Sequence, residues 1–413
     1  MIDPSEIAAA RQALGRLLAK YRKAAGLNQH QLAPHTHYGR STIANVEVGR
    51  QNVPRSFWER CDQALKAGGR LLAASDRLDA QLRRQREETA QLADVEQERE
   101  QHLPGLRFVA ELASPSQVGD VLVHLRDQWH LLVKTDNLLG PRHAVRGVVD
   151  QIAVIEELLR VTRDVTRREV AQLAAQYAES AAWLHEDAGD LPRARYWTGR
   201  AIEWAHEAQD PLMLAWTLFR RSQQALTEHD AGQAVGLAQA AHLDGSRLPP
   251  PMRAAVVQQE ARGFALDNDE ATSQRLMDTA HQWAAADDSG DARQGHGSFC
   301  TPSYIEIQRA ECWQMVGRPQ RAISTYEAAL ADLPAVYHRD RGVALAGLAT
   351  AYAANREPDR AATVATEALR IARASGSSRT LGAVSAVGQA LGPFRNVQSV
   401  AALLDQLAES APA

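Results

Sequence analysis

Small side chains recur at fixed intervals along the C-terminal half of this chain. In five consecutive blocks, an Ala or Ser is followed by a second one twelve residues later and by a third seven residues after that. The fifteen positions are Ala182, Ala194, Ala201, Ser222, Ala234, Ala241, Ala261, Ser273, Ala280, Ala310, Ala322, Ala329, Ala349, Ala361 and Ala368. A turn-forming segment such as GDLPRA or REPDRA lies between the first and second position of each block. This spacing predicts five pairs of helices that cross closely at small residues.

The pattern resembles the tetratricopeptide repeat, whose two helices meet where both carry small side chains. The blocks follow one another every 39 to 49 residues, longer than the family's period, and the longest inter-repeat loop is DDSGDARQGHGSF before Cys300. The resemblance implies an all-α protein with a tetratricopeptide-like right-handed α-solenoid and a concave inner surface. We place the repeats at 169–377, an N-terminal helical cap at 117–168 and C-terminal capping helices at 378–413.

The first helix of each pair is predicted to direct aromatic, amide and charged side chains toward the concave surface. These candidate ligand-binding residues are Glu179, Trp183, Phe219, Gln223, Gln258, Arg262, Tyr304 and Glu311. Such mixtures line grooves that take a peptide or small organic molecule. The competing interpretation is that the tryptophans, Trp183 included, only pack between helices.

A second informative stretch, Leu27 to Gln51, is predicted to form two short helices joined by a tight turn. Asn28 is suited to cap the first helix, and Pro34 limits that helix to about two turns. Residues 37–39 form the turn. The second helix is expected from about Arg40 to Val48, and a glycine follows it as a stop signal.

The outward face of that second helix carries Arg40, Ser41 and Asn45, and Arg and Asn are suited to reading guanine and adenine in the major groove. The segment also has Leu-x-Gln at the first helix, a β-branched residue within the second, and Glu-x-Gly-Arg at its end. It resembles the helix-turn-helix of the Cro/phage-repressor class, the XRE family, over roughly residues 11–75. One departure is His37, where the family usually has Gly because the backbone takes a positive φ.

The XRE resemblance implies a role for each matching residue. The implied DNA-binding residues are Asn28, Gln29, Arg40, Ser41, Thr42, Asn45 and Arg50. Among them, Asn28 and Gln29 are expected to contact phosphate, and Arg50 the DNA backbone. Glu47 is expected to form a structural ion pair with Arg22 of the preceding helix.

Charge is divided unevenly along the chain. Residues 1–70 contain 11 Lys or Arg and 5 Asp or Glu, a formal charge of +6, whereas the remainder contains 35 and 45, or −10. A positive N-terminal part on a negative body fits a module that approaches phosphate. We therefore expect an XRE-type DNA-binding domain at 1–75, followed by a charged helical linker at 76–116.

Other classes of protein find little support in the sequence. Cys61, Cys300 and Cys312 are too few for a disulfide framework, and neither a secretion signal nor a membrane-spanning apolar stretch is present. His296 and Cys300 lack the further ligands of a zinc site, and there is no phosphate-binding glycine loop or nucleophile elbow. We expect a cytoplasmic protein that is no enzyme, with no metal, no cofactor and no membrane partner.

The order of these parts is similar to that of the peptide-pheromone receptor regulators of Gram-positive bacteria. The Ala- and Arg-rich composition and the segment NLLGPR resemble helix-turn-helix regulators with repeat domains from actinobacteria. This resemblance implies a homodimeric transcriptional regulator that binds a double-stranded DNA operator and responds to a peptide or small-molecule signal in the repeat groove. The alternative is a tetratricopeptide scaffold that binds a partner protein and does not recognise specific DNA.

Overall fold

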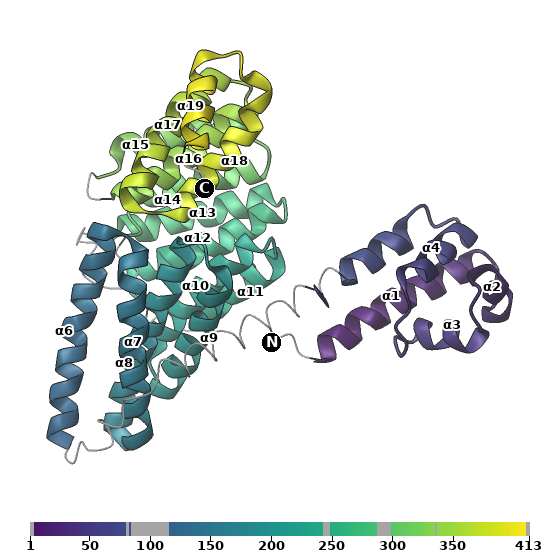
Figure 1. The fold of residues 1–413 in the computed structure, drawn as a ribbon, viewed down its shortest axis with the longest axis horizontal. Coiled ribbons are helices and arrows are strands. Elements are labelled where there is room, and N and C mark those ends of the chain that lie inside the picture. Colours follow the sequence, from purple (N-terminus) through teal and green to yellow (C-terminus); the bar gives the residue numbers. More distant parts are fainter. Residues whose placement is uncertain are drawn as a thin grey trace. The chain divides into compact units, whose positions relative to one another are not determined.

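The protein is described here by a computed structural model, which places residues 4–79, 82–83, 115–242, 248–286, 299–334 and 337–409. Over these residues the chain is helical and contains no β-strand (Figure 1), so the all-α prediction is confirmed. The chain separates into two compact units, Met1–His102 and Leu103–Ala413, called below the N-terminal unit and the repeat unit. Most of the predicted linker at 76–116 lies outside the described residues.

The N-terminal unit is a small helical bundle. Its helices are α1 (Pro4–Ala24), α2 (Gln29–Thr36), α3 (Arg40–Glu47) and α4 (Arg55–Ala64), followed by a further helical stretch at 70–79. Leu18, Leu32, Ile43 and Phe57 are fully buried at its centre. Helices α1 and α3 cross at Gly15, where an added Cβ would lie 2.3 Å from the carbonyl oxygen of Val46. This close approach fixes α3 on α1.

The repeat unit begins with α6 (Pro115–Leu139) and α7 (Pro141–Val161). The stretch TDNLLGPRHAV has the polar residues and the Gly-Pro pair of a turn, but in the structure α6 continues to Leu139 and α7 begins at Pro141. Only Gly140, with a φ of +92°, separates the two helices, because Pro141 fits the first position of a helix. The polar residue that suggested a turn, Asp136, instead lies buried in an ion pair with Arg339.

Five helix pairs follow, as the spacing of small residues predicted. They are α8 (Asp164–Asp187) with α9 (Leu191–Ala208), α10 (Pro211–Thr227) with α11 (Ala231–His242), α12 (Pro250–Leu266) with α13 (Glu270–Ala285), α14 (Pro302–Met315) with α15 (Pro319–Asp332), and α16 (His338–Ala354) with α17 (Pro358–Ser375). All fifteen small residues are buried, none more than 5% exposed. Ser222 shows why size matters at the crossing, because its hydroxyl donates to the carbonyl of Ala234 on the second helix at 2.8 Å.

The C-terminal end of the repeat unit consists of α18 (Ser378–Leu391), the short 3-10 helix η3 (Gly392–Phe394) and α19 (Gln398–Ala408). Helix α18 contacts α8, and α17 contacts α6, so the two ends of the helix series touch. Among the described residues, every helix is too short or too polar to cross a lipid bilayer.

Candidate nucleic-acid interface

Helix α3 presents a polar face to solvent. Arg40, Ser41 and Asn45 are exposed, while Ile43 and Val46 are buried on the opposite side. Helix α3 is therefore anchored by apolar contacts, and the side chains suited to reading base edges are left accessible.

The start of α2 is fixed by reciprocal hydrogen bonds. The Asn28 side chain accepts from the Gln31 amide at 2.9 Å, and the Gln31 side chain accepts from the Asn28 amide at 2.8 Å. Both bonds satisfy backbone donors that a helix start leaves unpaired. The side-chain oxygen of Asn28, a residue expected to contact phosphate, thus serves as a helix cap.

The turn between α2 and α3 uses a left-handed residue. His37 ends α2 with a φ of 60°, the positive value that the XRE resemblance implied at this position. Gly39 then caps α3 without a side-chain hydrogen bond. After α3, Gly49 has a φ of 76°, and an added Cβ there would lie 2.8 Å from Gln12, so the exit from the helix also depends on glycine.

Glu47 forms a buried network beneath this face. Its carboxylate accepts from Arg22 Nε at 2.6 Å and Nη2 at 3.0 Å, and from Gln29 Nε2 at 2.7 Å. Arg22 also donates to the carbonyl of Leu27 at 2.8 Å, and its hydrogen bond to Glu47 raises its pKa. The network joins α1, α2 and α3. Gln29, which the resemblance assigned to phosphate, here uses its amide nitrogen to hold Glu47.

The remaining DNA-binding candidates lie at the edges of this face. Arg50 is exposed just after α3, and Thr42 is half-buried on it. Two further cations of α1, Arg16 and Lys20, are exposed as well. The N-terminal unit therefore carries several exposed cationic side chains. Side chains that contact phosphate oxygens must be exposed in this way.

The ligand-binding candidates lie inside the repeat unit, and several pair with one another. Arg262 donates to Glu311 at 2.7 Å. Glu179 accepts from Arg220 Nε at 2.8 Å and from Trp216 Nε1 at 3.0 Å. Arg220 was not among the sequence candidates, and the only sequence signal for it is its place next to Phe219 on the same helix.

Burial separates these candidates into two groups. Phe219 and Gln258 are fully buried and Tyr304 is 9% exposed, so the structure does not place these three on an open groove. Trp183 is half-buried, with the guanidinium of Arg220 4.7 Å and that of Arg379 5.0 Å from its ring centre. Four aromatic side chains form a cluster. Trp216 stacks on Phe219 with ring centres 4.8 Å apart, and Phe299 contacts both Trp216 and Tyr304.

Gln258 differs from the other candidates because its amide is unsatisfied. Neither its oxygen nor its nitrogen forms a hydrogen bond among the described residues, although the side chain is fully inside the protein. The remaining candidate amide, on Gln223, accepts from Arg220 Nη1 at 3.1 Å. A buried amide without partners is costly.

A group of charged side chains joins the two ends of the repeat unit. Arg339 of α16 donates to both carboxylate oxygens of Asp136 on α6 at 3.0 to 3.1 Å, and Ser377 donates to Asp187 of α8 at 2.7 Å. Arg379 lies 3.7 Å from Asp187. Burial raises the pKa of Asp136, and its hydrogen bonds with Arg339 act against that rise. We call this group the closing cluster; no pattern in the sequence predicted it.

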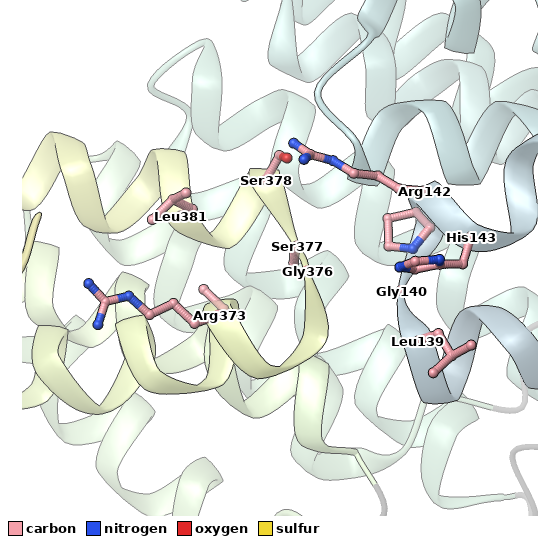
Figure 2. Close-up of a pocket in the computed structure, with 11 residues that line it drawn as sticks. Leu139, Gly140, Arg142, His143, Arg373, Gly376, Ser377, Ser378 and Leu381 are labelled. Carbon is pink, nitrogen blue, oxygen red and sulfur yellow. The ribbon is translucent and has the colours of Figure 1, made fainter. Parts of the chain in front are cut away.

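A pocket of about 210 Å³ lies beside the closing cluster. Figure 2 shows Gly140, Arg142 and His143 on one wall and the segment from Gly376 to Leu381 on the other. Its volume is below the range of about 300 to 1,000 Å³ typical of ligand pockets, so we assign it no ligand. Within the described residues, no group of three or more His, Cys, Asp or Glu side chains is placed to hold a metal ion; His296 lies outside them.

Comparison with known proteins places one part of the chain in a family. One solved structure with a distant similarity to this chain is the crystal structure of Bacillus thuringiensis PlcR in complex with the peptide PapR7 and DNA. That chain is 13% identical, with a TM-score of 0.31 and coverage of 76% of this chain and 94% of PlcR. No curated protein matches the sequence. The family profile described as a helix-turn-helix domain matches residues 13–74, so this part of the N-terminal unit is a helix-turn-helix domain.

Proposed function

We propose that this protein is a transcriptional regulator in the cytoplasm that binds operator DNA through an XRE-type helix-turn-helix. The observation that carries this proposal is the face of α3, where Arg40, Ser41 and Asn45 are exposed above the buried network of Glu47. A base-reading side chain must be both accessible and held in one orientation, and this arrangement supplies both conditions. Exposed cations on α1 and after α3 supply phosphate contacts.

We further propose that the repeat unit senses a peptide or small-molecule signal and joins two copies into a homodimer. The half-buried Trp183, its neighbouring arginines and the unsatisfied amide of Gln258 support a ligand site inside the unit. In a dimer, two helix-turn-helix domains read half-sites one helical turn apart. Both bind the operator only when the dimer holds them at that spacing. A signal that prefers one arrangement of the repeat unit shifts the population of binding-competent dimers by its differential affinity for the two states.

Asn45→Ala tests the role of α3. Removing a base contact costs about 1 to 3 kcal/mol of discrimination, so this variant is expected to bind a selected operator about 5- to 150-fold more weakly and random duplex unchanged. The operator is first obtained by selecting genomic fragments with the purified protein, and affinity is then measured by fluorescence anisotropy. Asn52→Ala, the same change at an exposed site outside α2 and α3, is the matched control and should leave discrimination unchanged. Retained operator preference in Asn45→Ala would overturn the assignment.

The alternative function, a scaffold for a partner protein, makes a different prediction about salt. Neutralising several phosphates releases counterions, so DNA affinity falls by orders of magnitude between low and moderate salt. A protein partner held in the repeat unit lacks this steep dependence. Selection of no common DNA sequence, together with a flat salt dependence of partner binding, would favour the scaffold.

A further inference from the structure

Helix α6 carries an unusual share of the exposed apolar surface. Ten large apolar side chains are exposed among the described residues, and five of them lie on α6, although it is one helix among many. They are Val123, Leu131, Val133, Leu138 and Leu139. Concentrated apolar exposure on one element marks an interaction surface more often than scattered exposure does.

Three of these side chains share one face of α6. Val123, Leu131 and Leu138 are 56%, 56% and 69% exposed, and a turn of about 100° per residue brings them to the same side as Asp127 and Lys134. Both charged residues are exposed. These five residues form what we call the α6 stripe.

The opposite side of α6 attaches the helix to its own unit. Val118, Leu122 and Leu125 are at most 6% exposed and belong to the core of the repeat unit. Figure 1 shows α6 at the edge of that unit, next to α7. Helix α6 thus packs inward through one face and leaves the α6 stripe outward.

The order of residues along the α6 stripe matches its own reverse. If two copies of α6 lie antiparallel about a point between His130 and Leu131, Val123 lies opposite Leu138 of the second copy. In the same register, Asp127 lies opposite Lys134 of the second copy. The two apolar end residues therefore meet each other and Asp127 meets Lys134, whereas Leu131 lies opposite His130 and Asp120, which is exposed on the same side, lies opposite Pro141. A parallel arrangement would instead place Asp127 against Asp127 and Lys134 against Lys134.

We propose that the α6 stripe is the surface through which two copies of this chain pair, with their α6 helices antiparallel. A two-fold interface uses the same patch on both chains and must be self-complementary, which is the property that the charges of the α6 stripe have. The proposal rests on the homodimer of the proposed function and names its surface. Two-fold pairing also agrees with the symmetry of a palindromic operator.

Charge reversal in the full chain tests both the location of the interface and the antiparallel orientation of the two α6 helices. Asp127→Lys places Lys opposite Lys twice per dimer and should raise the dimer dissociation constant roughly tenfold at low ionic strength. The double variant Asp127→Lys with Lys134→Asp restores both pairs in the antiparallel arrangement and should return the constant to within about twofold of wild type. Sedimentation equilibrium of the full-length protein measures each constant. All substituted side chains are exposed, so circular dichroism should show unchanged folding.

Leu138→Glu provides an independent reading, because it sets a charge against the apolar Val123 of the second copy and should leave the chain monomeric. Val165→Glu is the matched control, since Val165 is 67% exposed at the start of α8 and lies off the α6 stripe; it should dimerise normally. A dimer that survives Asp127→Lys and Leu138→Glu is held by another surface and overturns this proposal while leaving the regulator intact. A wild-type chain that stays monomeric at the highest concentration reached overturns it too. DNA recognition by α3 is judged separately, from Asn45→Ala.

Discussion

Single side chains inside the repeat unit show what an unpaired polar group costs. Gln258 and Gln224 are both buried, at 0% and 4% exposure, on the first helix of a pair. Gln224 donates to the hydroxyl of Thr198 at 2.8 Å, whereas the amide of Gln258 has no partner among the described residues. Burying an amide without a hydrogen bond destabilises the fold by about 1 to 3 kcal/mol, the cost of removing the amide from water.

The substitution Gln258→Leu is therefore expected to stabilise the ligand-free repeat unit by about 1 to 3 kcal/mol, because leucine has a similar volume and no unpaired amide. Urea denaturation followed by circular dichroism measures the change. The matched variant Gln224→Leu should destabilise the same unit, since it leaves the Thr198 hydroxyl without its donor. If both variants lose stability alike, the Gln258 amide is satisfied in solution and is no mark of a ligand site.

At the scale of elements, the junction of α6 and α7 depends on one glycine. Gly140 has a φ of +92° and a ψ of 169°, a backbone region essentially restricted to glycine. A Cβ at this position would also lie 2.6 Å from the carbonyl oxygen of Ser375, at the end of α17. Gly140 thus sets the direction of α7 and permits the close contact between the two ends of the repeat unit.

Gly140→Ala should destabilise the repeat unit by at least about 2 kcal/mol, because it adds both backbone strain and a steric clash. Gly199→Ala is the control: Gly199 lies within α9 and has nothing within 4 Å of the added methyl group. That change should be neutral or stabilise by up to about 1 kcal/mol through helix propensity. Thermal unfolding of both variants gives the comparison, and equal melting temperatures would show that the junction tolerates a side chain.

The repeat unit as a whole is closed by electrostatic contacts between residues distant in sequence. Arg339 and Asp136 form an ion pair although they are separated by 203 positions in the sequence. The pair is largely buried, because the Arg339 side chain is 19% exposed and that of Asp136 only 9%. Breaking such a buried pair from one side costs about 3 to 5 kcal/mol, because the remaining charge is left in the interior. We therefore expect the closing cluster to hold the two ends of the helix series together.

Arg339→Met should open this end of the repeat unit. Amide hydrogen exchange is expected to speed up at the C-terminal end of α6 and in α17 and α18, while the N-terminal unit stays unchanged. Arg341→Met is the control on the same helix, because Arg341 is 37% exposed and pairs at the surface with Glu367 at 3.5 Å, a contact worth about 0 to 1 kcal/mol. Unaltered exchange in Arg339→Met would mean that apolar packing alone holds the ends together.

The sequence by itself determined the local and repetitive features of this protein. Helix periodicity, the spacing of small residues and the chemistry of caps act between neighbours, so they predicted the helix pairs and the capping role of Asn28; the positive φ of His37 was implied by the resemblance to the XRE family. The outward face of α3 followed from the same periodicity, because Ile43 and Val46 must point inward. The pairing of Glu47 with Arg22, 25 positions apart, was implied instead by the resemblance to the XRE family.

Only the tertiary structure decided which distant residues meet. Asp136 near the end of α6 is neutralised by Arg339 across 203 positions, and no local rule contains that contact. Phe219 and Gln258 lie inside rather than on a groove, since burial depends on how the whole series of helices curves and closes. Small errors in the angle between successive helix pairs accumulate along a repeat protein. The sequence therefore specifies each helix pair, whereas the combined angles of all pairs determine which ends and faces of the repeat unit meet.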